Sequence, residues 1–343
     1  MSNIYMIAYN IYISTIKKCI VLITIIMPAI LLIGCSNQIT NDPITRTGFY
    51  FDTVIQITLY DESKTSCIDE CFALAEKYEN MFSPTVRNSD LWNINHSAGN
   101  PIIVSDETAA LLRTALSYCE LTNGRIDVTI ESVNSLWDFH TDEGADVPAD
   151  ADIAEALTHV DYHALQIDGN TVTLTDPEAK ITLGFIAKGY IADKMKEYLL
   201  SRDVKSAIIN LGGNLLAVGS KPDGTAFSFG VQKPFDVQGT PITVLSVSDR
   251  SLVSSGVYER CFYRNNILYH HILDTSTGYP MENGLLSVTI LSDSSTVGDA
   301  LSTTCFVLGA EEGMVIIESL ENTEAIFIYS DYHMEYSSGF VLQ

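Results

Sequence analysis

The chain has 343 residues, of which 46% are hydrophobic, so it is long enough to bury the core of one large domain or two small ones. Its 43 acidic and 19 basic residues give a formal net charge of −24. Such a charge repels phosphate backbones and anionic lipid headgroups, and we therefore expect no nucleic acid as a partner. A small anionic ligand can still bind where a cation or oriented backbone amides offset its charge.

The N-terminus has the pattern of a secretory signal. Lys17 and Lys18 precede an unbroken apolar run over residues 19–33, and the run leads into the sequence LIGC, which ends at Cys35. A basic region, an apolar region and a small-residue cleavage site are typical of such signals. The LIGC sequence resembles a bacterial lipobox, which implies cleavage before Cys35 and a lipid on its thiol.

This pattern predicts the organisation of the whole chain. We expect a lipoprotein signal peptide over residues 1–34, a polar tether over residues 35–47 and one folded domain over residues 48–343. The domain is expected outside the cytoplasm, held at the cell membrane by the lipid on Cys35. The alternative is an uncleaved membrane anchor, although the apolar run is short for a spanning helix.

The remaining segments alternate between strand and helix patterns. Alternation of β-forming residues predicts strands, and a helical apolar period predicts helices. In chain order we expect a strand over 53–61, helices over 67–81 and 105–124, a hairpin over 165–176, a helix over 186–200, a strand–turn–strand unit over 206–219, strands in FSFGV, ITVLSVSD and LLSVTILS, helices over 299–308 and 311–320, and a strand in EAIFIYS. This mixture, with no internal repeat, predicts a single α+β domain with mostly antiparallel sheets.

Common nucleotide and hydrolase motifs are absent. The patterns GxGxxG, GxxxxGK[ST], GxSxG, HExxH and CxxC do not occur. Dinucleotide, P-loop, serine-hydrolase and zinc-site interpretations therefore have no support from sequence motifs.

Several polar stretches carry possible chemistry, each with a structural alternative. Asp299 and Thr303 lie four residues apart at an expected helix start, where two hard oxygen donors can hold Mg²⁺, although Asp299 can equally cap the helix. Lys188 lies between two glycines at a loop-to-helix junction, which suits a phosphate or a solvated helix entry. Asp127 either caps the next element or pairs with an amine of a ligand. The stretch HHILDTSTGYP (270–280) is either a surface hairpin or the edge of an active site.

Taken in order, these segments resemble the motifs of the ApbE family, the FAD:protein FMN transferases. The matching stretches span about residues 48–310 and are FDTVIQITLYD, MFSPTVRNSDLWNIN, GRIDVTIESVNSLWDF, LGFIAKGYIADKM, INLGGNLLAVG, SSGVYERCF, HHILDTSTGYP and GDALSTTCFVLG. The resemblance implies an ApbE-like fold and an extracytoplasmic enzyme that binds FAD and Mg²⁺. It also implies transfer of the FMN half of FAD onto a Ser or Thr hydroxyl of a partner redox protein, with release of AMP.

The resemblance further implies roles for individual residues. Asp299, Thr303 and the backbone carbonyl of Phe185 match the metal ligands, and His271 matches the histidine that assists phosphoryl transfer. Histidine is a suitable base near neutral pH. We expect His270 to be a solvated neighbour. The residues implied in FAD binding are Arg125, Ile126 and Asp127 at the adenine end, Lys188 beside the flavin nucleotide, Thr182 in place of a family aspartate that contacts FAD, and Leu273 in the FAD-contacting segment that carries His271.

Departures from the family pattern leave alternatives open. Thr182 stands where the family has an aspartate, and Phe185 stands where it has a small residue. One alternative is an FAD pyrophosphatase that uses water as the acceptor. The other is a non-catalytic flavin-binding lipoprotein, against which the presence of Asp299, Thr303 and His271 argues.

Overall fold

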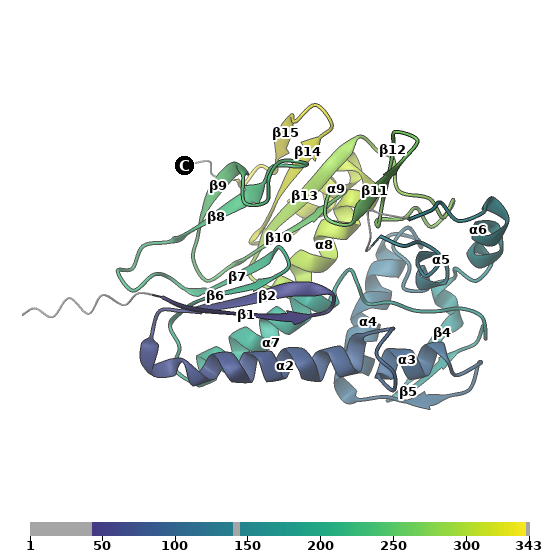
Figure 1. Cartoon of the computed structure of the whole chain (residues 1–343), viewed down its shortest axis with the longest axis horizontal. Coiled ribbons are helices and arrows are strands. Elements are labelled where there is room, and N and C mark those ends of the chain that lie inside the picture. Colours follow the sequence, from purple (N-terminus) through teal and green to yellow (C-terminus); the bar gives the residue numbers. More distant parts are fainter. Residues whose placement is uncertain (1–42, 140–144, 341–343) are drawn as a thin grey trace, which may run out of the picture. The chain divides into compact units, whose positions relative to one another are not determined.

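An eight-stranded antiparallel sheet forms the centre of the folded domain (Figure 1). The computed structural model describes residues 43–139 and 145–340, so the predicted signal peptide and Cys35 lie outside the described residues. The strands follow the order β1–β2–β6–β7–β10–β13–β14–β15. Their bounds are β1 Ile44–Tyr50, β2 Thr53–Leu59, β6 Ser206–Leu211, β7 Asn214–Gly219, β10 Ser251–Gly256, β13 Leu285–Ser292, β14 Thr323–Tyr329 and β15 Met334–Tyr336.

Both faces are buried along the middle strands of this sheet, where successive side chains point to opposite faces. In β14, Ala325 and Phe327 belong to the core on the helical face, whereas Ile326 and Ile328 belong to the core on the opposite face. The helical face is covered by α2 (Ser66–Phe82), α7 (Ala187–Ser201), α8 (Ser295–Leu308) and α9 (Ala310–Glu318). The hairpin of β8 (Phe227–Gln232) and β9 (Pro241–Val247) contributes Phe227, Phe229 and Leu245 to the opposite core.

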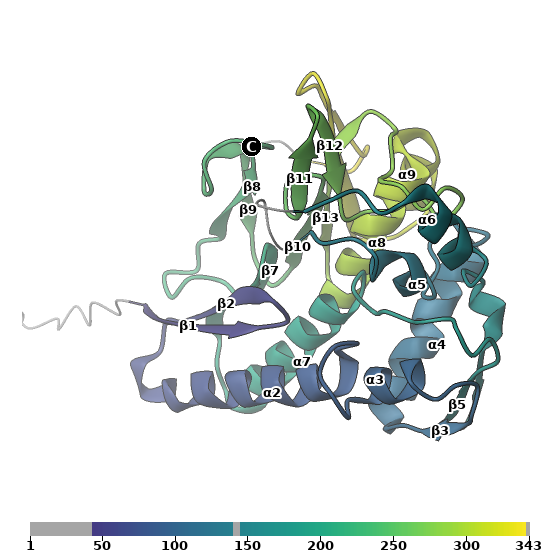
Figure 2. The same cartoon turned by 45° about the vertical axis from the view of Figure 1, so that its right-hand side comes forward.

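Smaller elements build the walls around the site. Along the chain between β2 and α7, besides α2, the helical elements are η1 (Glu62–Lys64), α3 (Asp90–Asn95), α4 (Asp106–Leu121), α5 (Glu131–Asn134), α6 (Asp150–Leu157) and η2 (Tyr162–Ala164). The same part of the chain forms a three-stranded sheet of β3 (Ile102–Ile103), β5 (Thr171–Leu174) and β4 (Leu165–Asp168). The hairpin of β11 (Cys261–Arg264) and β12 (Ile267–His270) faces α5 and α6 (Figure 2). Trp137, Phe139, Phe262 and Tyr269 stack between these parts and support the chain on either side of them.

The fold confirms the predicted class, an α+β domain with mostly antiparallel sheets. Strand β1 begins at Ile44, inside the segment 35–47 that the sequence analysis assigned to the tether. None of the helices within residues 43–139 and 145–340 has the length and apolar character needed to cross a bilayer.

Candidate active site

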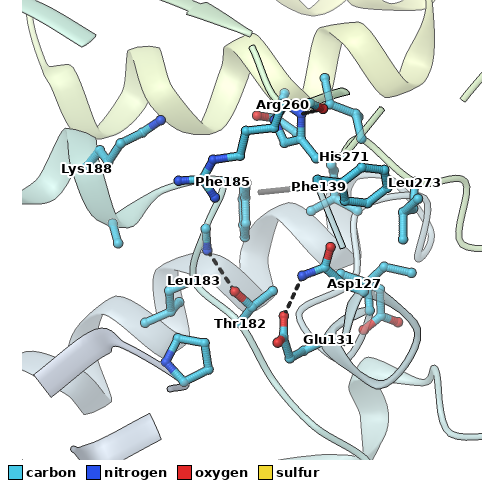
Figure 3. Close-up of a pocket in the computed structure, with 18 of the residues that line it drawn as sticks. Asp127, Glu131, Phe139, Thr182, Leu183, Phe185, Lys188, Arg260, His271 and Leu273 are labelled. Atoms are coloured by element: carbon cyan, nitrogen blue, oxygen red, sulfur yellow. Dashed lines mark hydrogen bonds between the residues drawn. The ribbon is translucent and has the colours of Figure 1, made fainter. Parts of the chain in front are cut away.

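A cavity of about 310 Å³ opens beside the first turn of α7 (Figure 3). Its walls come from the β1–β2 turn, the end of α2, the segment 125–139, the residues that lead into α7, the residues between β10 and β11, the segment after β12, and α8. Every predicted site residue except Asp299 lines this cavity. Asp299 lies one helical turn before Thr303 in α8 and is only 3% exposed.

The start of α8 differs from the prediction. The helix begins at Ser295 rather than at Asp299, so the placement of Asp299 at the helix N-terminus is wrong. Ser294 is the N-cap residue, and Asp193 of α7 accepts hydrogen bonds from the backbone amides of Ser295 and Thr296 at 2.8 and 2.9 Å. Because these groups already cap α8, Asp299 does not serve as its cap.

A close crossing of α7 and α8 fixes the Asp299 carboxylate. A Cβ at Gly189 would lie 2.2 Å from the carbonyl oxygen of Ser295, so only glycine allows this approach. The Gly189 amide donates to Asp299 Oδ2 at 2.8 Å. Burial raises the pKa of Asp299 to about 6, although Lys188 and the Gly189 amide act to lower it. The sequence therefore holds a buried carboxylate against the first turn of a neighbouring helix.

Phe185 directly precedes the N-cap residue of α7, the helix whose first turn donates to Asp299. In a regular helix the Gly189 amide would donate to the backbone carbonyl of Phe185, but here that amide donates to Asp299. No backbone amide in the part of the chain that the structure describes donates to the Phe185 carbonyl. Thr303 lies one turn after Asp299, and its hydroxyl is 3.0 Å from the Ser255 hydroxyl.

These oxygen donors fit a hard cation. A carboxylate, a carbonyl and a hydroxyl are the ligand types that Mg²⁺ prefers, with water or phosphate oxygens completing the coordination. The described residues contain no cluster of three or more His, Cys, Asp and Glu side chains that could hold a metal ion. A metal at Asp299 would therefore depend on the backbone carbonyl, the hydroxyl and the substrate for its other ligands.

His271 presents a neutral imidazole to the cavity. Its Nδ1 lies 3.3 Å from the carbonyl oxygen of Arg260, which can only accept a hydrogen bond, so Nδ1 carries the proton. The Nε2 atom is then left with a lone pair. Burial lowers the pKa of His271 to about 3, and the nearby Arg260 acts in the same direction. The side chain is thus neutral near pH 7 and able to accept a proton at Nε2.

His270 is buried, and the expectation that it is solvated is wrong. The residue is 4% exposed, and its ring lies edge-on to Phe306. The Ile272 amide donates to its Nδ1 at 3.3 Å, and its Nε2 donates to the Met281 carbonyl at 3.1 Å. Burial lowers its pKa to about 4. His270 therefore ties the two ends of the turn that carries His271.

Two acidic side chains lie on another side of the cavity (Figure 3). Asp127 Oδ1 accepts hydrogen bonds from the amide and hydroxyl of Thr129 at 2.8 and 2.6 Å, and its Oδ2 accepts from the Tyr162 amide at 2.9 Å. Both of its oxygens thus hold the local backbone, which matches the capping alternative. Glu131 accepts a hydrogen bond from the side-chain amide of Asn134 at 2.9 Å, and burial raises the pKa of Glu131.

The other predicted FAD-binding residues line the cavity in different ways. Arg125 pairs with Glu312 of α9 at 3.0 Å on the exposed rim. Ile126 and Leu273 are buried apolar residues. The Thr182 hydroxyl accepts from the Gly184 amide at 3.2 Å and therefore shapes the entry to α7.

The sequence analysis did not assign site roles to Arg260 and Glu259, which also line the cavity. The Arg260 guanidinium donates to the Phe51 carbonyl at 3.4 Å, so it joins the β1–β2 turn to this wall. The Glu259 side chain is exposed within the cavity, yet surrounding protein raises its pKa to about 7, and Lys188 acts against that rise. The signal in the sequence was the stretch SSGVYERCF, which contains both residues and matches a motif of the family.

Comparison with known proteins decides the family. A sequence profile of the ApbE family matches residues 51–327. The chain belongs to the ApbE family. A FAD:protein FMN transferase from Treponema pallidum is 31% identical over 328 residues, which covers 90% of this chain and 90% of that protein. A second protein of that name, from Klebsiella pneumoniae, is 35% identical over 280 residues, which covers 80% of this chain and 85% of the relative.

Solved structures of ApbE proteins share the fold. The crystal structure of an ApbE protein from Thermotoga maritima has a TM-score of 0.79 and 29% identity, and the match covers 87% of this chain and 97% of that one. The flavin transferase ApbE from Vibrio cholerae has a TM-score of 0.77 and 27% identity, with 87% and 98% covered. The ApbE profile spans all residues that line the cavity, so the whole site lies within the family domain.

Proposed function

We propose that this ApbE protein moves the FMN half of FAD onto a Ser or Thr hydroxyl of an acceptor redox protein and releases AMP. Relatives named FAD:protein FMN transferase support this reaction. The structural observation that carries the proposal is that His271, Lys188 and Thr303 line one cavity, while Asp299 is buried one helical turn before Thr303. A neutral base, a cation and oxygen ligands for a metal are the groups that phosphoryl transfer to a hydroxyl requires.

The pyrophosphate of FAD is proposed to bind on the side of Lys188 and Arg260 (Figure 3). The protein as a whole is strongly acidic, so local cations are needed to hold a doubly charged group. Mg²⁺ held by Asp299, Thr303 and the Phe185 carbonyl would offset phosphate charge and stabilise the charge that develops on the leaving AMP. The apolar side chains of Phe139, Phe185 and Leu273 offer surfaces for the rings of FAD.

His271 is proposed to act as the general base. Its Nε2 accepts the proton of the acceptor hydroxyl as the hydroxyl oxygen bonds to the phosphorus on the FMN side. The bond from that phosphorus to the bridging oxygen breaks, and this oxygen leaves with AMP. The Arg260 carbonyl keeps the proton on Nδ1, so Nε2 is the atom free to accept the proton of the hydroxyl.

The site is further proposed to work outside the cytoplasm, on a lipid anchor at Cys35. The support is the sequence of the N-terminal segment, in which two lysines and an apolar run precede LIGC. Attachment beside membrane redox proteins would bring the enzyme close to its acceptors.

The metal part of the proposal is tested with Asp299→Ala. The variant loses the one charged oxygen ligand, so FMN transfer with Mg²⁺ should fall by about 10²-fold or more. Transfer is measured by the mass gain of an acceptor, and circular dichroism checks that the fold persists. The control is Asp203→Ala, which removes an exposed carboxylate after α7 and far along that helix from Gly189. Native transfer rates in Asp299→Ala would rule out this metal site.

A further inference from the structure

Asn214 occupies a buried position between three elements of the site. It is the first residue of β7, directly after the turn that Gly212 and Gly213 form with φ values of 60° and 93°. The residue is 1% exposed. Its Oδ1 accepts a hydrogen bond from the Ser295 hydroxyl in the first turn of α8, at 2.7 Å.

This hydrogen bond fixes which way the amide of Asn214 points. The Ser295 hydroxyl donates to Oδ1, so Nδ2 faces the other way, where it can only donate. Ser295 is itself fully buried, which removes water as a competing partner for either group. The orientation of the Asn214 amide is therefore set by the protein alone.

Ser295 and Asp299 lie four residues apart on α8, so the Asn214 side chain, which contacts the Ser295 hydroxyl, lies beside the turn that carries Asp299. The Nδ2 atom of Asn214 is buried and has no hydrogen-bond partner among the described residues. The Asn214 side chain also acts to lower the pKa of Asp299, which agrees with an amide N–H directed at that carboxylate. Burying an amide N–H without a regular partner costs stability, so its retention at this place calls for a role.

We propose that Asn214 is a positioning residue that holds the Asp299 carboxylate in the orientation in which it binds Mg²⁺. The inference rests on the metal assignment within the proposed function. Asp299 receives the Gly189 amide from α7 on Oδ2 and faces the Asn214 amide from β7, so two elements define the plane of the carboxylate. Ser295 acts on Asp299 only indirectly, because its hydroxyl orients the side-chain amide of Asn214. Partners of this kind are known to tune the affinity of ligating carboxylates for metals.

The test measures metal binding directly. Mn²⁺ replaces Mg²⁺ as the probe, and its binding to the FAD complex is followed by electron paramagnetic resonance. Asn214→Ala should weaken Mn²⁺ binding by about 10–100-fold. Asn214→Leu, which keeps a similar volume without the amide, should weaken it to the same extent. Affinity for FAD without metal should stay close to native.

Two further variants separate positioning from packing. Ser295→Ala should weaken Mn²⁺ binding less than Asn214→Ala, and the double variant should be no worse than Asn214→Ala alone, because Ser295 acts through Asn214. The control is Thr304→Val, which removes another buried hydroxyl of α8 that has no hydrogen-bond partner among the described residues. It should bind Mn²⁺ as the native protein does.

The outcomes distinguish this inference from the proposed function. Native Mn²⁺ affinity in Asn214→Ala, or additive effects of Asn214 and Ser295, would overturn the positioning role. Should both Asn214 variants fail to fold, Ser295→Ala decides: weaker Mn²⁺ binding supports the role, and native binding overturns it. Mn²⁺ binding that depends on Asn214 in a protein without FMN transfer would support this inference and refute the proposed function. Native Mn²⁺ affinity in Asn214→Ala, in a protein that transfers FMN, would do the reverse.

Discussion

Replacement of His270 by Gln should change how the stability of the protein depends on pH. Burial lowers the pKa of His270 from 6.5 to about 4 in the folded protein. Between these values the unfolded chain binds the proton and the folded protein does not, so acid favours unfolding. The contribution of His270 to the free energy of unfolding is therefore largest above pH 6.5, and it is lost as the pH falls toward 4. A pKa difference of this size between the folded and unfolded states corresponds to about 3 kcal/mol in the free energy of unfolding.

The assay is urea unfolding of the native protein and of His270→Gln at pH 7 and pH 4. At pH 7 the variant should be less stable by about 1–2 kcal/mol, because it loses packing against Phe306 while a Gln amide can still donate to the Met281 carbonyl. At pH 4 the native protein should have lost about 3 kcal/mol of stability through His270, so the variant should be the more stable of the two by about 1–2 kcal/mol. His163→Gln, which removes an imidazole that is 72% exposed, controls for the loss of a histidine. An equal difference between the native protein and His270→Gln at both pH values would refute the reasoning.

Three other predictions follow from the site and its supports. His271→Asn should lower the FMN transfer rate by about 10²–10⁴-fold with near-native FAD affinity by flavin fluorescence, and a loss of affinity with full turnover at saturation would make His271 a binding residue instead. Gly189→Ala should lower the free energy of unfolding by about 1–3 kcal/mol or more in urea, because a Cβ there meets a backbone oxygen at 2.2 Å, whereas Gly184→Ala, with its nearest atom at 3.5 Å, should cost less. Cys35→Ala should release the protein from membranes in cell fractionation, and unchanged retention would count against the lipid anchor.

Local pattern predicted the regular elements well. Ser105 before an amphipathic run and Asn123–Gly124 after it indicated the helix that the structure shows as α4, where the Ser105 hydroxyl caps the Thr108 amide. The start of α8 was missed because only part of its cap is local: the Ser294 hydroxyl accepts from the Val297 amide, whereas other amides of the first turn donate to Asp193. Asp193, about a hundred residues earlier in the chain, accepts the amides of that first turn, and no sequence window contains both.

The motifs predicted most of the cavity, because seven of the eight matching stretches contribute residues that line it. The burial of His270 could not be predicted from the neighbouring sequence, because nothing local distinguishes two adjacent histidines at the end of a short strand. Only packing against Phe306 and the bond to Met281 bury one of them. The role inferred for Asn214 likewise depends on a contact between β7 and α8 that is set by the tertiary fold.

The most direct test of the proposed reaction is the intact mass of an acceptor protein after incubation with this enzyme, FAD and Mg²⁺. The account predicts that the acceptor gains one FMN, less one water, and that AMP appears in equal amount. The gain should disappear when the target Ser or Thr of the acceptor is replaced by Ala. Release of free FMN and AMP with an unchanged acceptor would identify a hydrolase instead. Unchanged FAD and acceptor would contradict a catalytic role altogether.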